Sequence, residues 1–283
     1  MQHVAPKQIE DAVENRLIYR QSAWTRVTHW LWAISLFFLL LTGLQIFNAH
    51  PALYIGDQSG FQFDNSVLRI GAENTPDGPR GFTTILGAKF DTTGVLGWSG
   101  DPPKPRGFPA WATIPSFQDL GTGRVIHFFF AWVFGLTLLV WLVASLFNGH
   151  AWRDVLPKLR DLRALPRDFI DHLKLKFHHT RDYNVLQKLA YAGVLFVLFP
   201  LMIATGLAMS PGFNAIAPWL AELLGGRQTA RTIHFAAMAL LVGFFVIHML
   251  MILAAGPINE LRSIITGWYR IDPVDAGAQE QKP

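Results

Sequence analysis

The chain alternates between four long apolar runs and polar segments. The apolar runs lie at Trp30–Phe47, Val125–Phe147, Leu189–Met209 and Ile233–Ala255. Each approaches the length of about 20 residues with which an α-helix crosses a bilayer. The pattern therefore predicts an all-α membrane protein, a bundle of four transmembrane helices over 24–47, 124–148, 184–209 and 231–256. Pro200 falls inside the third run, so we expect that helix to bend where neighbours satisfy the freed carbonyl.

Polar segments connect and flank these runs, and they cover 1–23, 48–123, 149–183, 210–230 and 257–283. The longest of them is rich in Gly, Pro, Asp and Asn, with stretches such as ENTPDGPRG and SGDPPKPRGFP and no strong helical period. We therefore expect a long irregular loop between helices 1 and 2. A loop of this length is often functional.

The distribution of positive charge predicts the orientation. Sixteen of the 24 Lys and Arg residues lie before the first apolar run, between the second and third runs, or after the fourth. Because Lys and Arg collect on the cytoplasmic side, both termini and segment 149–183 are expected to be cytoplasmic in a bacterial inner membrane. Segments 48–123 and 210–230 are then periplasmic. The rule works best for loops below about 60 residues, a length that 48–123 exceeds.

Composition narrows the function. The net charge of +4 does not indicate nucleic-acid binding, because the basic residues flank apolar runs and form no RNA-binding motif. The chain contains no cysteine, which excludes disulfides, thiolate-bound iron–sulfur clusters and a CxxCH haem attachment within it. A redox centre bound by this chain must therefore use other ligands.

Four histidines near the ends of the runs are candidate ligands. His234 and His248 stand on the fourth run, about 21 Å apart and within about 40° of the same helix face. His29 lies at the expected cytoplasmic end of helix 1, and His127 at the expected periplasmic start of helix 2. Depth therefore pairs His29 with His248 and His127 with His234. Two such pairs suit the axial positions of two six-coordinate haems b, whereas zinc would require four ligands at each site.

A histidine at a helix end can also be an interfacial hydrogen-bonder, but four at matched depths favour ligation. Three of them follow an arginine by three residues, so Arg26, Arg124 and Arg231 are candidate contacts for haem propionates. The alternative is that these arginines only anchor the helix ends at the interface. Gly43, Gly135 and Gly243 would let a flat macrocycle approach a helix, although such glycines usually serve helix packing.

These motifs resemble a known family. Four motifs carry the resemblance: R-x-x-H-W at Arg26–Trp30, R-x-x-H-F at Arg124–Phe128, Y-N-x-x-Q-K at Tyr183–Lys188, and R-x-x-H-F with a second histidine fourteen residues on. The chain resembles the four-helix, two-haem cytochrome b subunits of nickel–iron hydrogenase, respiratory formate dehydrogenase and thiosulfate reductase. The resemblance implies the same two histidine pairs. It also implies a quinone site at Asn184, Gln187 and Lys188, where an amide cap followed by an interfacial lysine is the alternative.

The sequence therefore predicts an electron relay. Two haems would connect a periplasmic catalytic subunit with iron–sulfur, molybdenum or nickel–iron centres to the membrane quinone pool. The alternative is a self-contained cytochrome b quinone reductase that oxidises a small reductant such as superoxide. A transporter is disfavoured because the runs lack Asp, Glu, Lys and Arg. A haem-free anchor would show no Soret absorption.

Overall fold

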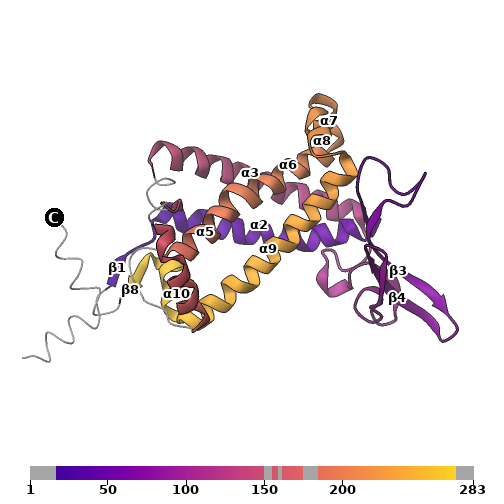
Figure 1. Ribbon diagram of the computed structural model, residues 1–283, viewed down its shortest axis with the longest axis horizontal. Coiled ribbons are helices and arrows are strands. Elements are labelled where there is room, and N and C mark those ends of the chain that lie inside the picture. The colour runs from indigo at the N-terminus through magenta and orange to yellow at the C-terminus, as the bar shows by residue number, and fades with distance from the viewer. Residues whose placement is uncertain (1–16, 150–154, 159–160, 175–183, 272–283) are drawn as a thin grey trace, which may run out of the picture. The chain divides into compact units, whose positions relative to one another are not determined.

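The computed structural model describes residues 17–149, 155–158, 161–174 and 184–271. Most of these residues are helical, and the described part contains four helices that are long and apolar enough to cross a membrane (Figure 1). They are α2 (Ala23–Phe47), α3 (Leu120–Phe147), a third span over Val185–Met209, and α9 (Arg227–Ala255). The predicted set of four helices is confirmed.

These helices expose their apolar side chains. Only 22% of the most apolar window of α2, and 11% of that of α9, is buried inside the chain. Large side chains such as Phe37 and Phe245 are exposed. Removing such surface from water is worth about 25 cal/mol per Å² of apolar area. The exposed faces are therefore suited to contact with lipid acyl chains.

Pro200 interrupts the third span. The span consists of α5 (Val185–Gly193), a π-helical turn (Val194–Leu198) and α6 (Phe199–Met209), with the proline in the first turn of α6. Proline has no N–H, so it cannot donate to the carbonyl of Phe196, four residues earlier. The wider π turn falls at this position, which is one of the known ways in which a helix accommodates a lost backbone bond.

The chain forms two compact units. We call the first the tail unit (Met1–Trp30, Leu139–Val197 and Val242–Pro283) and the second the insert unit (Leu31–Leu138 and Leu198–Leu241). Every long helix contributes one segment to each unit. As a result, His29 and His248 belong to the tail unit, and His127 and His234 belong to the insert unit.

The segment between α2 and α3 is rich in β-structure, so the expectation of an irregular loop in an all-α chain is wrong here. Its strands are β2 (Ala52–Tyr54), β3 (Ser66–Thr75), β4 (Gly78–Ile85), β5 (Ala88–Asp91), β6 (Gly97–Ser99) and β7 (Lys104–Arg106). The first four form an antiparallel sheet in sequence order, and β6 pairs with β7. The long β3–β4 hairpin is visible in Figure 1.

The high glycine content explains why the sequence of this segment suggested an irregular loop. Leu86 and Gly87 form the two-residue turn between β4 and β5 with φ of 49° and 85°, and such a turn favours Gly. Gly81 lies so close to β6 that an added Cβ would collide with backbone atoms of Leu96 and Trp98. Glycines that are typical of loops therefore form tight turns here, or allow two strands to lie close together.

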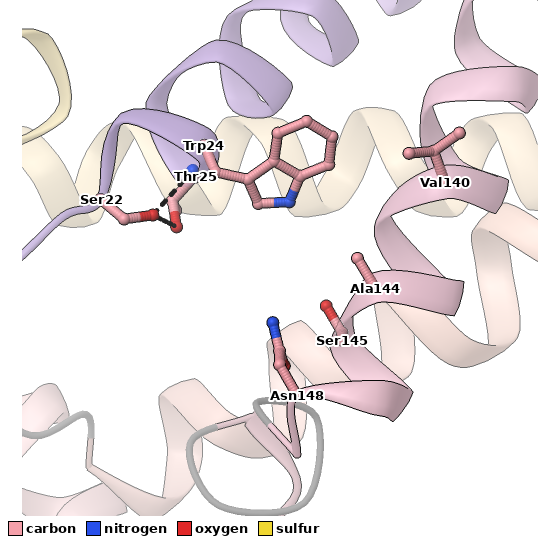
Figure 2. Close-up of a pocket in the computed structure, with 7 residues that line it drawn as sticks. All are labelled: Ser22, Trp24, Thr25, Val140, Ala144, Ser145 and Asn148. Atoms are coloured by element: carbon pink, nitrogen blue, oxygen red, sulfur yellow. Dashed lines mark hydrogen bonds between the residues drawn. The ribbon is translucent and has the colours of Figure 1, made fainter.

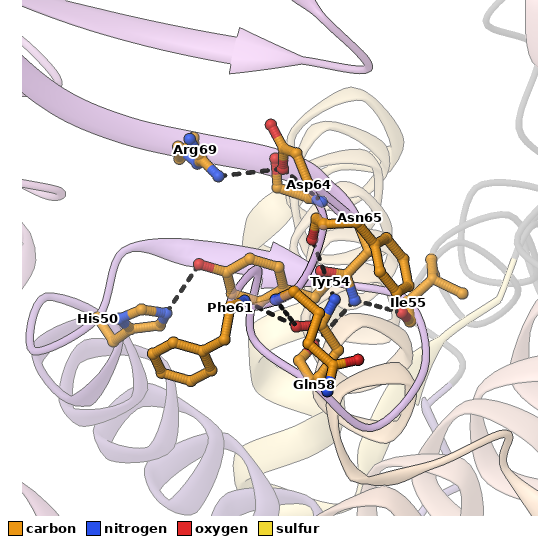
Figure 3. A network of polar contacts seen from close by, with 11 residues as sticks. His50, Tyr54, Ile55, Gln58, Phe61, Asp64, Asn65 and Arg69 are labelled. Carbon is orange, nitrogen blue, oxygen red and sulfur yellow. Dashed lines mark hydrogen bonds and ion pairs between the residues drawn. The ribbon is translucent and has the colours of Figure 1, made fainter.

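We call the segment between α2 and α3, residues 48–119, the insert. It packs on the end of α2 through a small apolar core. Phe47, Leu53 and Ile70 are buried together, and Phe108 and Phe235 pack against them. The loop that follows β2 is fixed by side-chain amides: Gln58 Oε1 accepts from the N–H of Phe61 at 2.7 Å, and Asn65 Nδ2 donates to the carbonyl of Ile55 at 2.7 Å (Figure 3). The insert is therefore an ordered body.

Short helices complete both units. The insert unit holds a 3₁₀ turn (Ala110–Ala112), α7 (Pro211–Ile216) and α8 (Trp219–Leu223). The tail unit holds a 3₁₀ turn (Asp161–Ala164), α4 (Leu165–Leu173) and α10 (Pro257–Thr266). In the tail unit β1 (Leu17–Tyr19) pairs antiparallel with β8 (Trp268–Arg270), so segments from near both ends of the chain lie side by side (Figure 1).

Candidate functional site

In the insert unit, a threonine from a neighbouring helix holds each histidine. Thr42 Oγ1 lies 3.0 Å from His127 Nδ1, and Thr205 Oγ1 lies 2.8 Å from His234 Nδ1. Both threonines are fully buried. A half-buried imidazole with one nitrogen fixed in this way is similar to a metal-ligating histidine, in which the second hydrogen bond sets the ring orientation.

A glycine follows each of these threonines, and the imidazole packs over it. A Cβ added to Gly43 would stand 3.4 Å from His127 Cε1, and one added to Gly206 would stand 3.6 Å from His234 Cε1. Gly43 is one of the three glycines that the sequence suggested. Gly135 instead faces Ile203, and Gly243 has no neighbour within 4 Å among the described residues.

Each unit holds both members of one predicted pair. His127 and His234 lie in the insert unit, and His29 and His248 lie in the tail unit. In the tail unit, His29 meets the indole of Trp30 edge-on at 5.5 Å, and His248 stacks on Phe244 at 5.7 Å. The structure divides the four histidines between the units in the same way as helix depth does, and their role as paired ligands stays a prediction.

Two of the three candidate arginines contact backbone carbonyls. Arg26 donates to Ile265 O at 2.7 Å, and Arg231 donates to His50 O at 2.6 Å. Arg124 is exposed and lies over the ring of Phe128 at 5.6 Å. The Nε atom of Arg26 is buried without a hydrogen-bond partner among the described residues. A donor in this state is suited to an anionic oxygen.

The start of α5 is a capping box. Asn184 Oδ1 accepts from the N–H of Gln187 at 2.8 Å, and Gln187 Oε1 accepts from the N–H of Asn184 at 3.3 Å. The N–H of Val185 donates to Asp168 on α4 at 3.0 Å. The side-chain oxygens of Asn184 and Gln187 therefore act as a helix cap, which was the alternative to a quinone site. The role of Lys188 in a quinone site stays a prediction. Tyr183, the first residue of this motif, lies outside the described residues.

The tail unit also has an open cleft of about 520 Å³ between the start of α2 and the end of α3. Its lining combines an indole, hydroxyls, an amide and small apolar side chains: Ser22, Trp24, Thr25, Val140, Ala144, Ser145 and Asn148. Figure 2 shows Ser145 and Asn148 directed into the opening below Trp24. Sequence reasoning missed this cleft because none of these residues stands in a motif.

The histidine pairs fit haem iron better than a bare metal ion. No group of three or more His, Cys, Asp or Glu side chains that could hold a metal ion occurs in the part of the chain that the structure describes. Two imidazoles complete the coordination of an iron that already has four porphyrin nitrogens. The glycines beside His127 and His234 leave room for the two imidazoles, and Arg26 Nε, which has no partner among the described residues, is a donor suited to a haem propionate.

The comparison with known families decides the identification. A model of the family described as prokaryotic cytochrome b561 matches residues 20–267, which is most of the chain. The chain belongs to this family. Members bind haem b, so the predicted family resemblance and the haem are confirmed at this level.

A relative of this cytochrome b561 chain carries a more specific description. The chain is 28% identical over 231 residues to a protein of Azospira oryzae described as a putative protein-methionine-sulfoxide reductase subunit, YedZ1. The match covers 81% of this chain and 87% of that protein. That protein is therefore similar over nearly its whole length.

Sequence reasoning found the four histidines but missed the threonines that orient two of them. The signal is present as a repeated tripeptide, Thr-Gly-Leu, at 42–44 and 205–207. Without the fold, a Thr-Gly pair in an apolar run indicates only helix packing. Only the structure shows that both pairs face an imidazole.

Proposed function

We propose that this chain is a membrane electron-transfer subunit that holds two bis-histidine haems b. It would relay electrons between a periplasmic redox subunit and the quinone pool of a bacterial inner membrane, with both termini cytoplasmic. The observation that carries the proposal is the presence of one histidine pair in each unit, all four on membrane-crossing helices. Membership of the cytochrome b561 family supports it.

When bound, each haem would supply a one-electron Fe(III)/Fe(II) couple, so that electrons from a two-electron donor move in single steps. The remaining work belongs to the residues of this chain. Thr42 and Thr205 hold the Nδ1 side of two ligands, which leaves Nε2 for iron. Arg26, Arg124 and Arg231, one helical turn before their histidines, would bind propionates.

Haem content tests this proposal. Purified protein is expected to hold two haems per chain by the pyridine haemochrome assay. His29→Ala and His127→Ala should each retain one. His50→Ala is the matched control, because His50 is exposed, lies outside the helices and bonds Tyr54. A wild-type chain with fewer than two haems, or His234→Ala with both retained, would contradict the assignment.

The quinone would bind in the tail unit, on the cytoplasmic side of the membrane. Its carbonyls need hydrogen-bond donors, and its protons need a route from water. The start of α5 offers the side-chain amide nitrogens of Asn184 and Gln187 and the ammonium of Lys188. The cleft between α2 and α3 offers the hydroxyl of Ser145 and the amide of Asn148, beside an indole on which a ring could stack. The start of α5 and the cleft are alternative binding sites for the quinone headgroup.

The catalytic subunit would dock on the insert. The description of the Azospira relative as a reductase subunit supports a catalytic partner for this chain as well. The fixed loop after β2 exposes 89% of Phe61 and 63% of Phe63. Exposed aromatic rings on a rigid loop are typical anchors of protein interfaces. Copurification with a periplasmic redox subunit tests this step, whereas turnover of quinone by the purified chain alone would favour the self-contained reductase.

A further inference from the structure

The two histidines of the insert unit share one local arrangement, although they contact different helices. In each case a Thr-Gly pair faces the imidazole, with the hydroxyl at Nδ1 and the glycine beneath Cε1. The arrangement therefore occurs twice with the same parts.

The hydroxyl proton of each of these two threonines already forms a hydrogen bond within its own helix. Thr42 Oγ1 donates to Phe38 O at 2.6 Å, and Thr205 Oγ1 donates to Leu201 O at 2.7 Å. A hydroxyl has a single proton, so towards the imidazole each oxygen acts as an acceptor. The ring nitrogen Nδ1 must then carry the proton. This fixes the tautomer in which Nε2 has the lone pair needed for iron.

The tail unit lacks this arrangement at His29. His29 Nδ1 is buried and has no hydrogen-bond partner within the described residues. The nearby threonine on the same helix, Thr28, donates to Trp24 O and Thr25 O. His29 therefore differs from His127 and His234 in the hydrogen bonding of its Nδ1 atom.

We propose that Thr42 and Thr205 are positioning residues that lock the ligand tautomer of His127 and His234 and lower the reduction potential at that pair. The proposal rests on the two-haem function proposed above. Donation from Nδ1–H makes an imidazole more basic, and a more basic ligand favours ferric over ferrous iron. The pair that contains His29 then has the higher potential, so electrons move from the insert unit to the tail unit in the favourable direction.

Redox titration with optical and low-temperature EPR detection tests the proposal. Thr42→Val and Thr205→Val remove the acceptor at nearly constant volume, and one of the two potentials should rise, with a shift of that low-spin ferric signal alone. Thr42→Ser and Thr205→Ser keep the hydroxyl and should restore the wild-type potential. Where a valine variant loses haem, the matching alanine variant is titrated instead.

Thr137→Val is the matched control. Thr137 is on the same helix as His127 and donates to Val133 O at 2.6 Å in the same way, but its partner is the indole of Trp32. The two haem reduction potentials of the Thr137→Val variant should equal those of wild type. The proposal is overturned if both potentials stay unchanged in haem-replete Thr42→Val and Thr205→Val, or if His29→Ala retains the higher-potential haem. A wild-type protein without two haems would instead overturn the proposed function itself.

Discussion

The backbone N–H of Gly56 donates to the side-chain hydroxyl of Thr229 at 2.7 Å, and Gly56 O accepts from the N–H of Thr229 at 3.2 Å. The insert thus bonds to the first turn of α9, the helix that carries His234. Asp57 Oδ1 accepts from the N–H of Arg227 at 3.2 Å, beside the same contact. Backbone donors at a helix start have no partner within the helix. The insert therefore caps the helix that carries His234 and His248.

Replacement of Thr229 by valine should destabilise this cap. The half-buried N–H of Gly56 would lose its partner, which costs about 1 kcal/mol of unfolding free energy. Thermal unfolding monitored by circular dichroism should show a lower midpoint. Thr84→Val is the control, because Thr84 is half-buried and its side chain has no hydrogen bond among the described residues. Equal midpoints for both variants would argue against the capping role.

Bulk at the two glycines should displace a ligand. Gly43→Val or Gly206→Val would push methyl groups into the imidazole of His127 or His234, which an added Cβ already approaches to 3.4 or 3.6 Å. We expect haem content to fall from two to about one per chain. Valine at Gly135 should leave both haems, because its neighbour is the movable Cδ1 of Ile203 at 3.9 Å. Full haem content in Gly43→Val and Gly206→Val would contradict the geometry.

Alkaline pH should weaken the tail unit through Tyr269. Burial, followed by the charge of Glu260, raises the pKa of Tyr269. Its hydroxyl donates to Glu260 at 3.1 Å, and the Arg20 guanidinium lies 4.3 Å from the ring centre. A raised folded-state pKa gives stability that is complete below the unfolded value of about 10 and is lost as pH rises above it.

Unfolding of wild type and Tyr269→Phe at pH 8 and pH 11 measures this effect. Wild type should lose more stability between the two pH values than the variant, which has no titrating hydroxyl. The same loss in both proteins would show that other groups cause the alkaline sensitivity.

Quinone-site variants should separate the two rival surfaces. Loss of one hydrogen bond to a carbonyl is worth about 1 kcal/mol, or roughly a fivefold slower haem reduction by quinol. Asn148→Leu tests the cleft and Lys188→Met tests the start of α5, each assayed for initial rate at equal haem content. A slower rate in one variant alone identifies the surface. If neither rate changes, the quinone binds elsewhere.

The exposed aromatic pair on the insert should control partner binding. Phe61→Ser with Phe63→Ser is expected to reduce copurification of the catalytic subunit at least tenfold, because interface anchors contribute about 2 kcal/mol or more each. Phe90→Ser, on β5 of the same insert and 53% exposed, is the control. Unchanged copurification with intact haem content would exclude this loop as the docking site. Lower membrane retention would indicate lipid contact instead.

The hydrophobic pattern was sufficient for the four helices, because a bilayer requires about 20 apolar residues in any span and no other element meets that requirement. Helix depth also predicts the pairs His29 with His248 and His127 with His234, because each helix has a fixed rise per residue, and the structure divides the same histidines between the two units. The insert could not be predicted in this way. Its strands are short, and glycines such as Gly81 are explained only by the strand that lies against them.

The site shows the same division between sequence and tertiary structure. The sequence by itself determined which imidazoles are available, because few polar residues occur in the apolar runs. Tertiary structure alone decided their hydrogen bonds: Thr42 meets His127 across 85 residues, and Thr205 meets His234 across 29. Local periodicity cannot encode a contact between side chains of different helices, because that contact depends on how the helices pack.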